Sequence, residues 1–240
     1  MATTTARDIL EVVASLDLHE KHEEYLALHA NRLAYAINAI KTYRAKKPIK
    51  RLLDIGPHFL TRCICEFFPD IEVSTLGWKL ERIVPGYLCK EHIQYDLNDC
   101  DSCDIVSLQA PFDLIVCSEV IEHLYTSPAI VLNSLQRLLT ARGAILIQTP
   151  NAATLSARLT LLRGRNPYEL IREQKTNPGH FREYTLDELV TYARATGFTV
   201  LEAQYCSYWV HPMAPIRWVE NAIPSFRRGM SLLIENTKIS

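Results

Sequence analysis

The sequence predicts an α/β fold: a seven-stranded, mainly parallel sheet with helices on both faces. From residue 48 onward, short apolar runs alternate with segments of helical periodicity, and strands that alternate with helices form mainly parallel sheets. The runs "LIVC" and "AILI" are apolar at every position, as is typical of strands covered on both faces. With 240 residues, 48% of them hydrophobic, the chain can bury one sizeable core. We expect one domain at 49–240 after a helical N-terminal extension at 1–48.

The expected elements follow one another in a regular order. Residues 7–46 carry apolar side chains at helical spacing, which predicts the helical extension. Helices are also predicted at 62–68, before Pro69, and at 129–143, closed by Gly143. Five apolar runs predict the parallel strands, at 48–56, 71–77, 92–99, 112–119 and 144–150.

The strand rhythm stops after the fifth strand. Residues 155–174 predict a helix, a turn and a second helix, within a lid insertion at about 152–178 over the strand ends. A further helix is predicted at 185–198, where Thr185 and Glu188 have capping-box spacing. Residues 199–210 and 226–238 then supply the last two strands as an antiparallel pair.

The charge balance limits the partners that this chain can be expected to bind. Lys and Arg total 26 against 27 for Asp and Glu, so the overall charge predicts neither a nucleic acid nor an anionic membrane as partner. A local basic patch stays open, and Arg158, Arg163, Arg165 and Arg172 on the lid are candidates for contacting an anionic group. No apolar run approaches the ~20 residues that span a bilayer.

The cysteines indicate reduced thiols. Seven cysteines form an odd set without paired zinc spacing, and the N-terminus does not resemble a signal peptide. The pair Cys100 and Cys103 has Cys-x-x-Cys spacing but stands alone, so a loop is the preferred interpretation. We expect a soluble, cytoplasmic protein.

Five motifs follow one another along the chain: "LLDIG" (52–56), "YDLND" (95–99), "FDLIVCSEVIEHL" (112–124), "GAILIQTPN" (143–151) and "HFREYTLDELVTYARATGF" (180–198). Together they resemble the class I S-adenosylmethionine-dependent methyltransferases, of the small-molecule type, which have a Rossmann-like fold. The resemblance covers roughly residues 50–205. In such open parallel sheets, ligands bind outside the carboxyl ends of the strands.

This resemblance implies a cofactor site for S-adenosylmethionine at the strand ends. Asp54 and Gly56 match the loop that wraps the methionine and ribose, and Asp96 matches the acid that meets the adenine amino group. The implied cofactor-binding residues are Asp54, Gly56, Pro57, His58, Gly77, Trp78, Asp96, Leu97, Ser118 and Glu119.

The sequence departs from the family pattern at two of these strand ends. The first loop has one glycine, with Pro57 and His58 where small residues are usual, and no acid ends the second strand, where Gly77 and Trp78 stand. Either Trp78 packs on the adenine and another polar group holds the ribose, or the site has diverged from S-adenosylmethionine.

The stretch "SEVIEHL" places two carboxylates and an imidazole directly after the fourth strand. It can be a packing motif, since acids are favoured near a helix N-terminus. It also resembles, together with the later His180, the metal-dependent 2′-O-methyltransferases of small RNAs and the ubiquinone-pathway O-methyltransferases. That resemblance implies metal ligands at Glu119, Glu122, His123 and His180, which suit Mg²⁺, Mn²⁺ or Zn²⁺. His123, His180 and Glu119 are the candidate catalytic residues, because a histidine can also act as general base without metal.

The sequence therefore predicts methyl transfer from S-adenosylmethionine to an oxygen of a small-molecule metabolite. A divalent metal can assist this transfer. The alternatives are a degenerate methyltransferase fold that serves as a binding or regulatory module, an N-methyltransferase, and an RNA 2′-O-methyltransferase. We expect a small-molecule acceptor beneath the lid rather than a nucleic acid. The extension can cap the cofactor pocket or pair with a second subunit, so both a monomer and a homodimer stay open.

Overall fold

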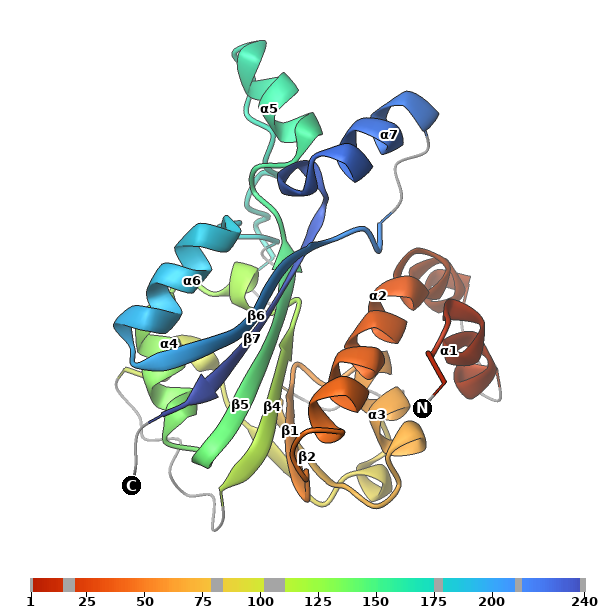
Figure 1. Cartoon of the computed structure of the whole chain (residues 1–240), viewed down its shortest axis with the longest axis vertical. Helices are drawn as coiled ribbons and strands as arrows, with labels where there is room; N and C mark the ends of the chain where they lie inside the picture. The colour runs from red at the N-terminus through yellow and green to blue at the C-terminus, as the bar shows by residue number, and fades with distance from the viewer. Residues whose placement is uncertain are drawn as a thin grey trace.

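The computed structural model describes residues 2–14, 20–78, 84–101, 111–174, 179–209 and 213–237. Its centre is a seven-stranded sheet of order β3-β2-β1-β4-β5-β7-β6 (Figure 1). The first five strands run parallel, and β7 pairs antiparallel with both β5 and β6. The predicted fold class is confirmed. The strands are β1 (Arg51–Ile55), β2 (Glu72–Gly77), β3 (His92–Gln94), β4 (Phe112–Ser118), β5 (Leu139–Pro150), β6 (Phe198–Cys206) and β7 (Gly229–Asn236).

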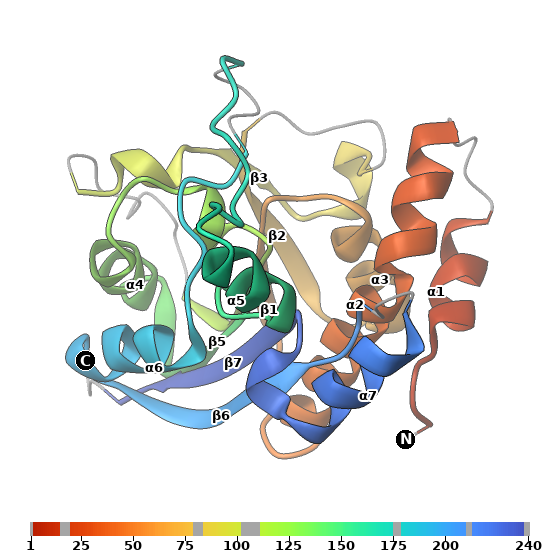
Figure 2. The same ribbon diagram turned by 90° about the horizontal axis from the view of Figure 1, so that it is seen from above.

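Helices cover both faces of this sheet (Figures 1 and 2). On one face lie α1 (Ala6–Val13), α2 (Glu20–Arg44) and α3 (Phe59–Phe67), and on the other lie α4 (Pro128–Gln136) and α6 (Leu186–Ala195). Neighbouring strand residues point to opposite faces, so Leu52 joins the core under α2 while Leu53 joins the core under α4. This double burial explains why the strand sequences are continuously apolar.

The helical extension forms part of the main core. Ile37 and Ile40 of α2 are fully buried in the same cluster as Leu52 of β1. A capping box at Thr5 starts α1, where the Thr5 side chain and Asp8 satisfy each other's backbone N–H groups. The extension therefore packs directly on the sheet.

The helix predicted at 129–143 is shorter than expected. α4 ends at Gln136, and β5 already begins at Leu139. Gly143 lies inside β5 and not at a helix end. A Cβ atom at this position would come within 2.8 Å of the Phe112 carbonyl oxygen. Because β5 pairs with β4 from Leu139 onward, residues 139–143 belong to the sheet and not to the helix.

The lid prediction is half correct. α5 (Leu155–Leu162) begins with the Thr154 side chain as N-cap, but the predicted second helix is wrong, since residues 165–174 have no helix. Asn166 instead accepts a hydrogen bond from the Tyr168 N–H across Pro167, a turn that interrupts the helical pattern. Residues 175–178 of the predicted lid, and Cys103 of the Cys-x-x-Cys pair, lie outside the described residues.

The end of the chain contains one element that the sequence reading did not anticipate. Along the chain, α7 (Ala214–Ala222) follows β6 and precedes β7. It lies beside α5 at the end of the molecule shown uppermost in Figure 1. The predicted capping box of α6 is confirmed, with Thr185 and Glu188 bonded reciprocally. Short 3-10 turns occupy Gly86–Leu88, Leu97–Asp99, Ile121–His123 and Pro224–Phe226.

Candidate functional site

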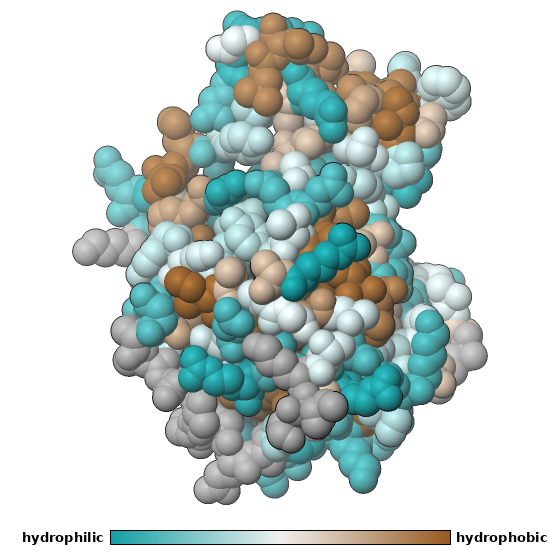
Figure 3. All heavy atoms as spheres, turned by 60° about the vertical axis from the view of Figure 1, so that its left-hand side comes forward, coloured by the Kyte–Doolittle hydropathy of each residue, from teal (hydrophilic) through white to brown (hydrophobic). Residues whose placement is uncertain are grey.

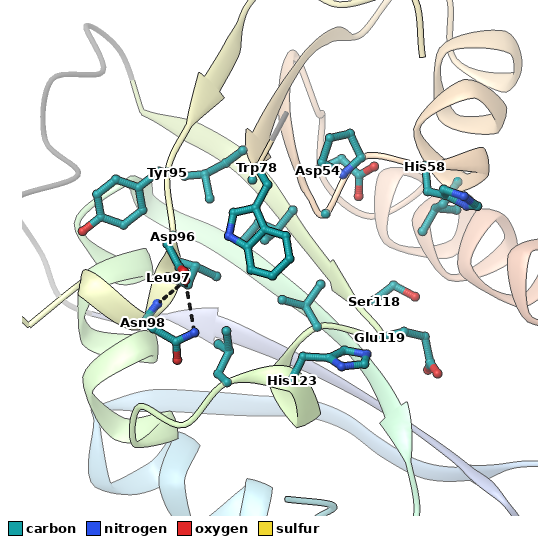
Figure 4. Close-up of a pocket in the computed structure, with 18 of the residues that line it drawn as sticks. Asp54, His58, Trp78, Tyr95, Asp96, Leu97, Asn98, Ser118, Glu119 and His123 are labelled. Atoms are coloured by element: carbon teal, nitrogen blue, oxygen red, sulfur yellow. Dashed lines mark hydrogen bonds between the residues drawn. The ribbon is translucent and has the colours of Figure 1, made fainter. Parts of the chain in front are cut away.

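A cavity of about 600 Å³ lies at the carboxyl ends of β1 to β4. It sits between β1 and β4, where the strand order reverses, which is the place where open α/β sheets bind ligands. All ten residues that the sequence assigned to a cofactor line this one cavity (Figure 4). The topology therefore brings together residues from four strand ends.

The loop after β1 forms one wall. Gly56 has φ +75°, and a Cβ atom there would come within 3.0 Å of Val120 Cγ2, so this position favours glycine. Asp54 is buried and accepts a hydrogen bond from Thr61 Oγ1 at 2.6 Å. Burial raises the pKa of Asp54 to about 7. Burial also lowers the pKa of His58 to about 4, so its imidazole is neutral at physiological pH.

The ends of β2 and β3 form the opposite wall. Trp78 follows Gly77, is 50% exposed, and points its indole into the cavity (Figure 4). Asp96 Oδ1 accepts hydrogen bonds from the backbone N–H and the side-chain amide of Asn98, at 2.9 and 3.1 Å. Asn98 in turn accepts from the Tyr125 N–H, which fixes both side chains of this wall.

Arg32 of α2 is a cavity residue that the sequence reading missed. Its side chain is 3% exposed, and its guanidinium donates to Ser118 Oγ at 2.7 Å and to the Tyr25 hydroxyl at 2.8 Å. Ser118 Oγ donates onward to Gln148 Oε1. A buried guanidinium normally pairs with an anion, but the groups that accept its hydrogen bonds among the described residues, Ser118, Tyr25 and His29, are neutral. The available signal was an arginine one residue before Leu33 on the apolar side of a helix.

Glu119 also lines the cavity, in an unusual backbone conformation. Its φ is +57°, whereas such values are rare for residues other than glycine. The residue is half-buried, and its buried Oε1 atom has no hydrogen-bond partner among the described residues. Burial, and secondarily the neighbouring Glu122, raise the pKa of Glu119 to about 8. This carboxyl group can accept a hydrogen bond from a ligand.

Glu122, His123 and His180 form a compact cluster beside the cavity. One ligand atom from each lies within 4.8 Å of the others. After β4 the chain forms the 3-10 turn Ile121–His123. The Glu122 carbonyl oxygen accepts a hydrogen bond from the Phe181 N–H at 2.8 Å, which holds His180 alongside. Glu119 is not in this cluster, so the predicted convergence of four ligands is wrong for this residue.

The polar contacts of the cluster leave one atom of each side chain available. His123 Nδ1 bonds to the Gly179 carbonyl oxygen at 2.8 Å, and His180 Nδ1 bonds to Glu183 at 2.9 Å. Both histidines therefore retain Nε2. Glu122 is fully buried, its Oε2 accepts from Thr149, and its Oε1 has no partner among the described residues. Burial raises the pKa of Glu122 to about 7.

Of the four predicted metal-ligand residues, Glu119 and His123 line the cavity, whereas Glu122 and His180 lie behind it. His123 belongs to both the cavity and the cluster. No described residue of the lid at 152–174 lines the cavity, although Phe181 does. None of the four lid arginines therefore lines this cavity.

Comparisons with known proteins agree with this geometry. A family model described as a methyltransferase domain matches residues 25–203. No curated protein matches the sequence significantly. The fold is similar to that of the plantazolicin methyltransferase BpumL, solved with a desmethylPZN analog and SAH (14% identity, TM-score 0.58, covering 96% of this chain and 95% of that one).

Two further solved structures share the fold. One is magnesium protoporphyrin IX methyltransferase (ChlM) from Synechocystis PCC 6803 with bound SAH (12% identity, TM-score 0.54, covering 95% of this chain and 91% of that one). The other is a SAM dependent methyltransferase from Archaeoglobus fulgidus (16% identity, TM-score 0.52, covering 88% and 99%). At these identities the likeness establishes the fold.

Proposed function

The chain belongs to the methyltransferase domain family and has the fold of class I S-adenosylmethionine-dependent methyltransferases; from this premise we propose that it transfers the methyl group of S-adenosylmethionine to an oxygen of a small-molecule metabolite. The observation that supports this proposal most is the cavity at the strand switch point, lined by all ten residues expected to bind the cofactor. Similar proteins have been solved with SAH.

The cofactor is proposed to lie with its adenine between Trp78 and Asp96. The Trp78 indole offers a flat apolar surface, and the Asp96 carboxylate accepts from the adenine amino group. At the other end, Arg32 pairs with the methionine carboxylate, since the hydrogen bonds of its buried charge to described residues go to neutral groups. Gly56 lets the backbone approach the cofactor closely.

His123 is the proposed general base for the acceptor hydroxyl. Because a carbonyl oxygen can only accept, the bond to Gly179 places the proton on Nδ1 and leaves Nε2 to take the acceptor proton. Burial lowers the pKa of His123, so the imidazole is neutral at pH 7. Glu119 is proposed to orient the acceptor through its unpartnered carboxyl oxygen. Most of the rate enhancement would come from alignment of acceptor oxygen, methyl carbon and sulfur.

A divalent metal at Glu122, His123 and His180 is the second candidate. The arrangement fits a metal: Glu122 Oε1 is buried and unpartnered among the described residues, and each histidine bonds through Nδ1 to an oxygen, the pattern that orients metal-ligating imidazoles. When bound, such an ion lowers the pKa of a coordinated hydroxyl. His123 Nε2 would then hold the ion rather than receive the proton, so the two roles exclude each other.

Titration calorimetry with S-adenosylmethionine, on chelator-treated protein and again with Mg²⁺, Mn²⁺ or Zn²⁺, tests the proposal. We expect micromolar binding in both conditions. An acceptor panel followed by mass spectrometry then detects methyl transfer, and loss of transfer on chelation supports the metal. A neutral amine acceptor needs no metal, so metal-independent transfer to amines would favour N-methylation. Absence of cofactor binding would favour the binding-module alternative.

A further inference from the structure

Large apolar side chains are exposed on α5 and α7, at one end of the molecule. Leu161 and Leu162 of α5 are 54% and 83% exposed, and Met213 and Trp218, before and within α7, are 57% and 73% exposed. We name these four residues the α5–α7 surface. Figure 3 shows apolar atoms gathered over this upper end, between hydrophilic ones. Exposed clusters of this kind mark interaction sites.

This surface is separate from the cofactor cavity. No described residue of 152–174 or 213–228 lines the cavity, and α5 stands away from the sheet in Figure 1. The two helices are nevertheless connected. The Asn151 amide donates to the carbonyl oxygens of Ser225 and Arg227, and the Arg158 guanidinium lies 5.0 Å from the centre of the Phe226 ring. The segments that carry the α5–α7 surface therefore form one unit.

The same two segments carry an excess of positive charge. Within 152–174 and 213–228 there are seven arginines and three glutamates, with no lysine or aspartate, whereas the whole chain has a net charge of −1. A second copy docked about a two-fold axis would bring the same excess against itself. A surface of anionic lipid headgroups complements it. The arginines are Arg158, Arg163, Arg165, Arg172, Arg217, Arg227 and Arg228.

We propose that the α5–α7 surface docks on the face of a bilayer that contains anionic lipids. Leu162 and its neighbours enter the boundary between headgroups and acyl chains, Trp218 lies at headgroup depth, and the arginines contact phosphate groups. No helix in the described residues is long and apolar enough to cross a membrane, so the docking is peripheral. The proposal does not depend on methyl transfer.

Co-sedimentation of the full chain with lipid vesicles tests this proposal. Vesicles of phosphatidylcholine alone are compared with vesicles that contain equal parts of phosphatidylcholine and phosphatidylglycerol, at low and high salt. We expect binding to the anionic vesicles that weakens with salt. The double substitution Leu162→Asp, Trp218→Asp should weaken it about tenfold or more, and Arg163→Gln about fivefold, the value for one basic residue near an anionic surface.

Leu28→Asp is the matched control, because Leu28 is 66% exposed on α2, outside the α5–α7 surface. It should bind vesicles like the wild type, and thermal melting should show that all variants are folded. Equal binding to both vesicle types, no binding, or unchanged binding of the double variant would overturn the proposal. So would light scattering that shows a dimer which the double variant dissociates, since a second copy would then occupy the surface.

Discussion

The proposed pairing of Arg32 with the methionine carboxylate predicts a selective loss of affinity in Arg32→Met. Removing one partner of a buried, hydrogen-bonded charge pair costs about 2–5 kcal/mol, so the Kd for S-adenosylmethionine should rise roughly 30-fold or more. 5′-Methylthioadenosine has the nucleoside and the thioether but lacks the carboxylate. Its affinity should change little. Calorimetric titration of both ligands into both proteins measures the difference.

The substitution should leave the fold nearly intact. Replacing a buried ion by an apolar residue of similar size is often neutral. Ser118 Oγ keeps its bond to Gln148 Oε1, but Ser118 Oγ, the Tyr25 hydroxyl and His29 Nδ1 each lose the donor that Arg32 supplied. Each lost hydrogen bond costs about 1 kcal/mol, which for a chain of this size corresponds to about 2–4 °C in Tm. Equal losses for both ligands would refute the pairing, as would unchanged affinity for S-adenosylmethionine. Arg158→Met, on α5 and outside the cavity, is the control.

Three further predictions concern the cavity walls and the cluster. Gly56→Ala should destabilise the fold by about 1–2 kcal/mol, because Gly56 has φ +75°, and urea unfolding with unchanged stability would contradict this reading. The pKa of Asp54 is raised to about 7 in the folded chain from its ordinary 3.8. As pH rises from about 4 to 7, the unfolded chain therefore loses this proton while the folded chain keeps it. Asp54 lowers the free energy of unfolding increasingly over this range, by at most about 4 kcal/mol. Asp54→Asn should therefore gain in urea midpoint over the wild type as pH rises from 5 to 8, and a constant difference would show that the carboxyl is not shifted. Glu122→Gln should abolish Mn²⁺ binding in calorimetry while S-adenosylmethionine binding persists; Mn²⁺ binding equal to that of the wild type would remove Glu122 from the ligand set.

The sequence was sufficient wherever a signal is local. Continuously apolar runs identified central strands such as β4 and β5, and Thr185 with Glu188 identified the start of α6, because burial on both faces and helix capping depend on a few neighbouring residues. The cavity residues were expected from the resemblance to class I methyltransferases, in which parallel strands place their carboxyl ends at one edge of the sheet.

Features that depend on contacts between distant segments were not predictable from the sequence. The helix predicted to reach Gly143 ends at Gln136, and residues from Leu139 pair with β4 instead, a long-range contact that no local pattern records. Glu119 and Glu122 are three residues apart, yet the positive φ of Glu119 and the short 3-10 turn after it keep Glu119 out of the cluster at Glu122. A helical continuation would have placed both on one face.

Arg32 shows most clearly the difference between what the sequence and the tertiary structure determine. In the sequence it is a charged residue within an apolar helix, whereas its contact with Ser118 in the structure joins residues 86 positions apart. Likewise, the lid arginines and leucines were visible in the sequence, but the structure placed them on the α5–α7 side of the molecule rather than on the cavity wall. Composition and periodicity determined which segments are buried and which strand ends meet. Only tertiary packing decided which polar groups share a cavity, because that depends on contacts between distant segments whose free energies no local pattern encodes.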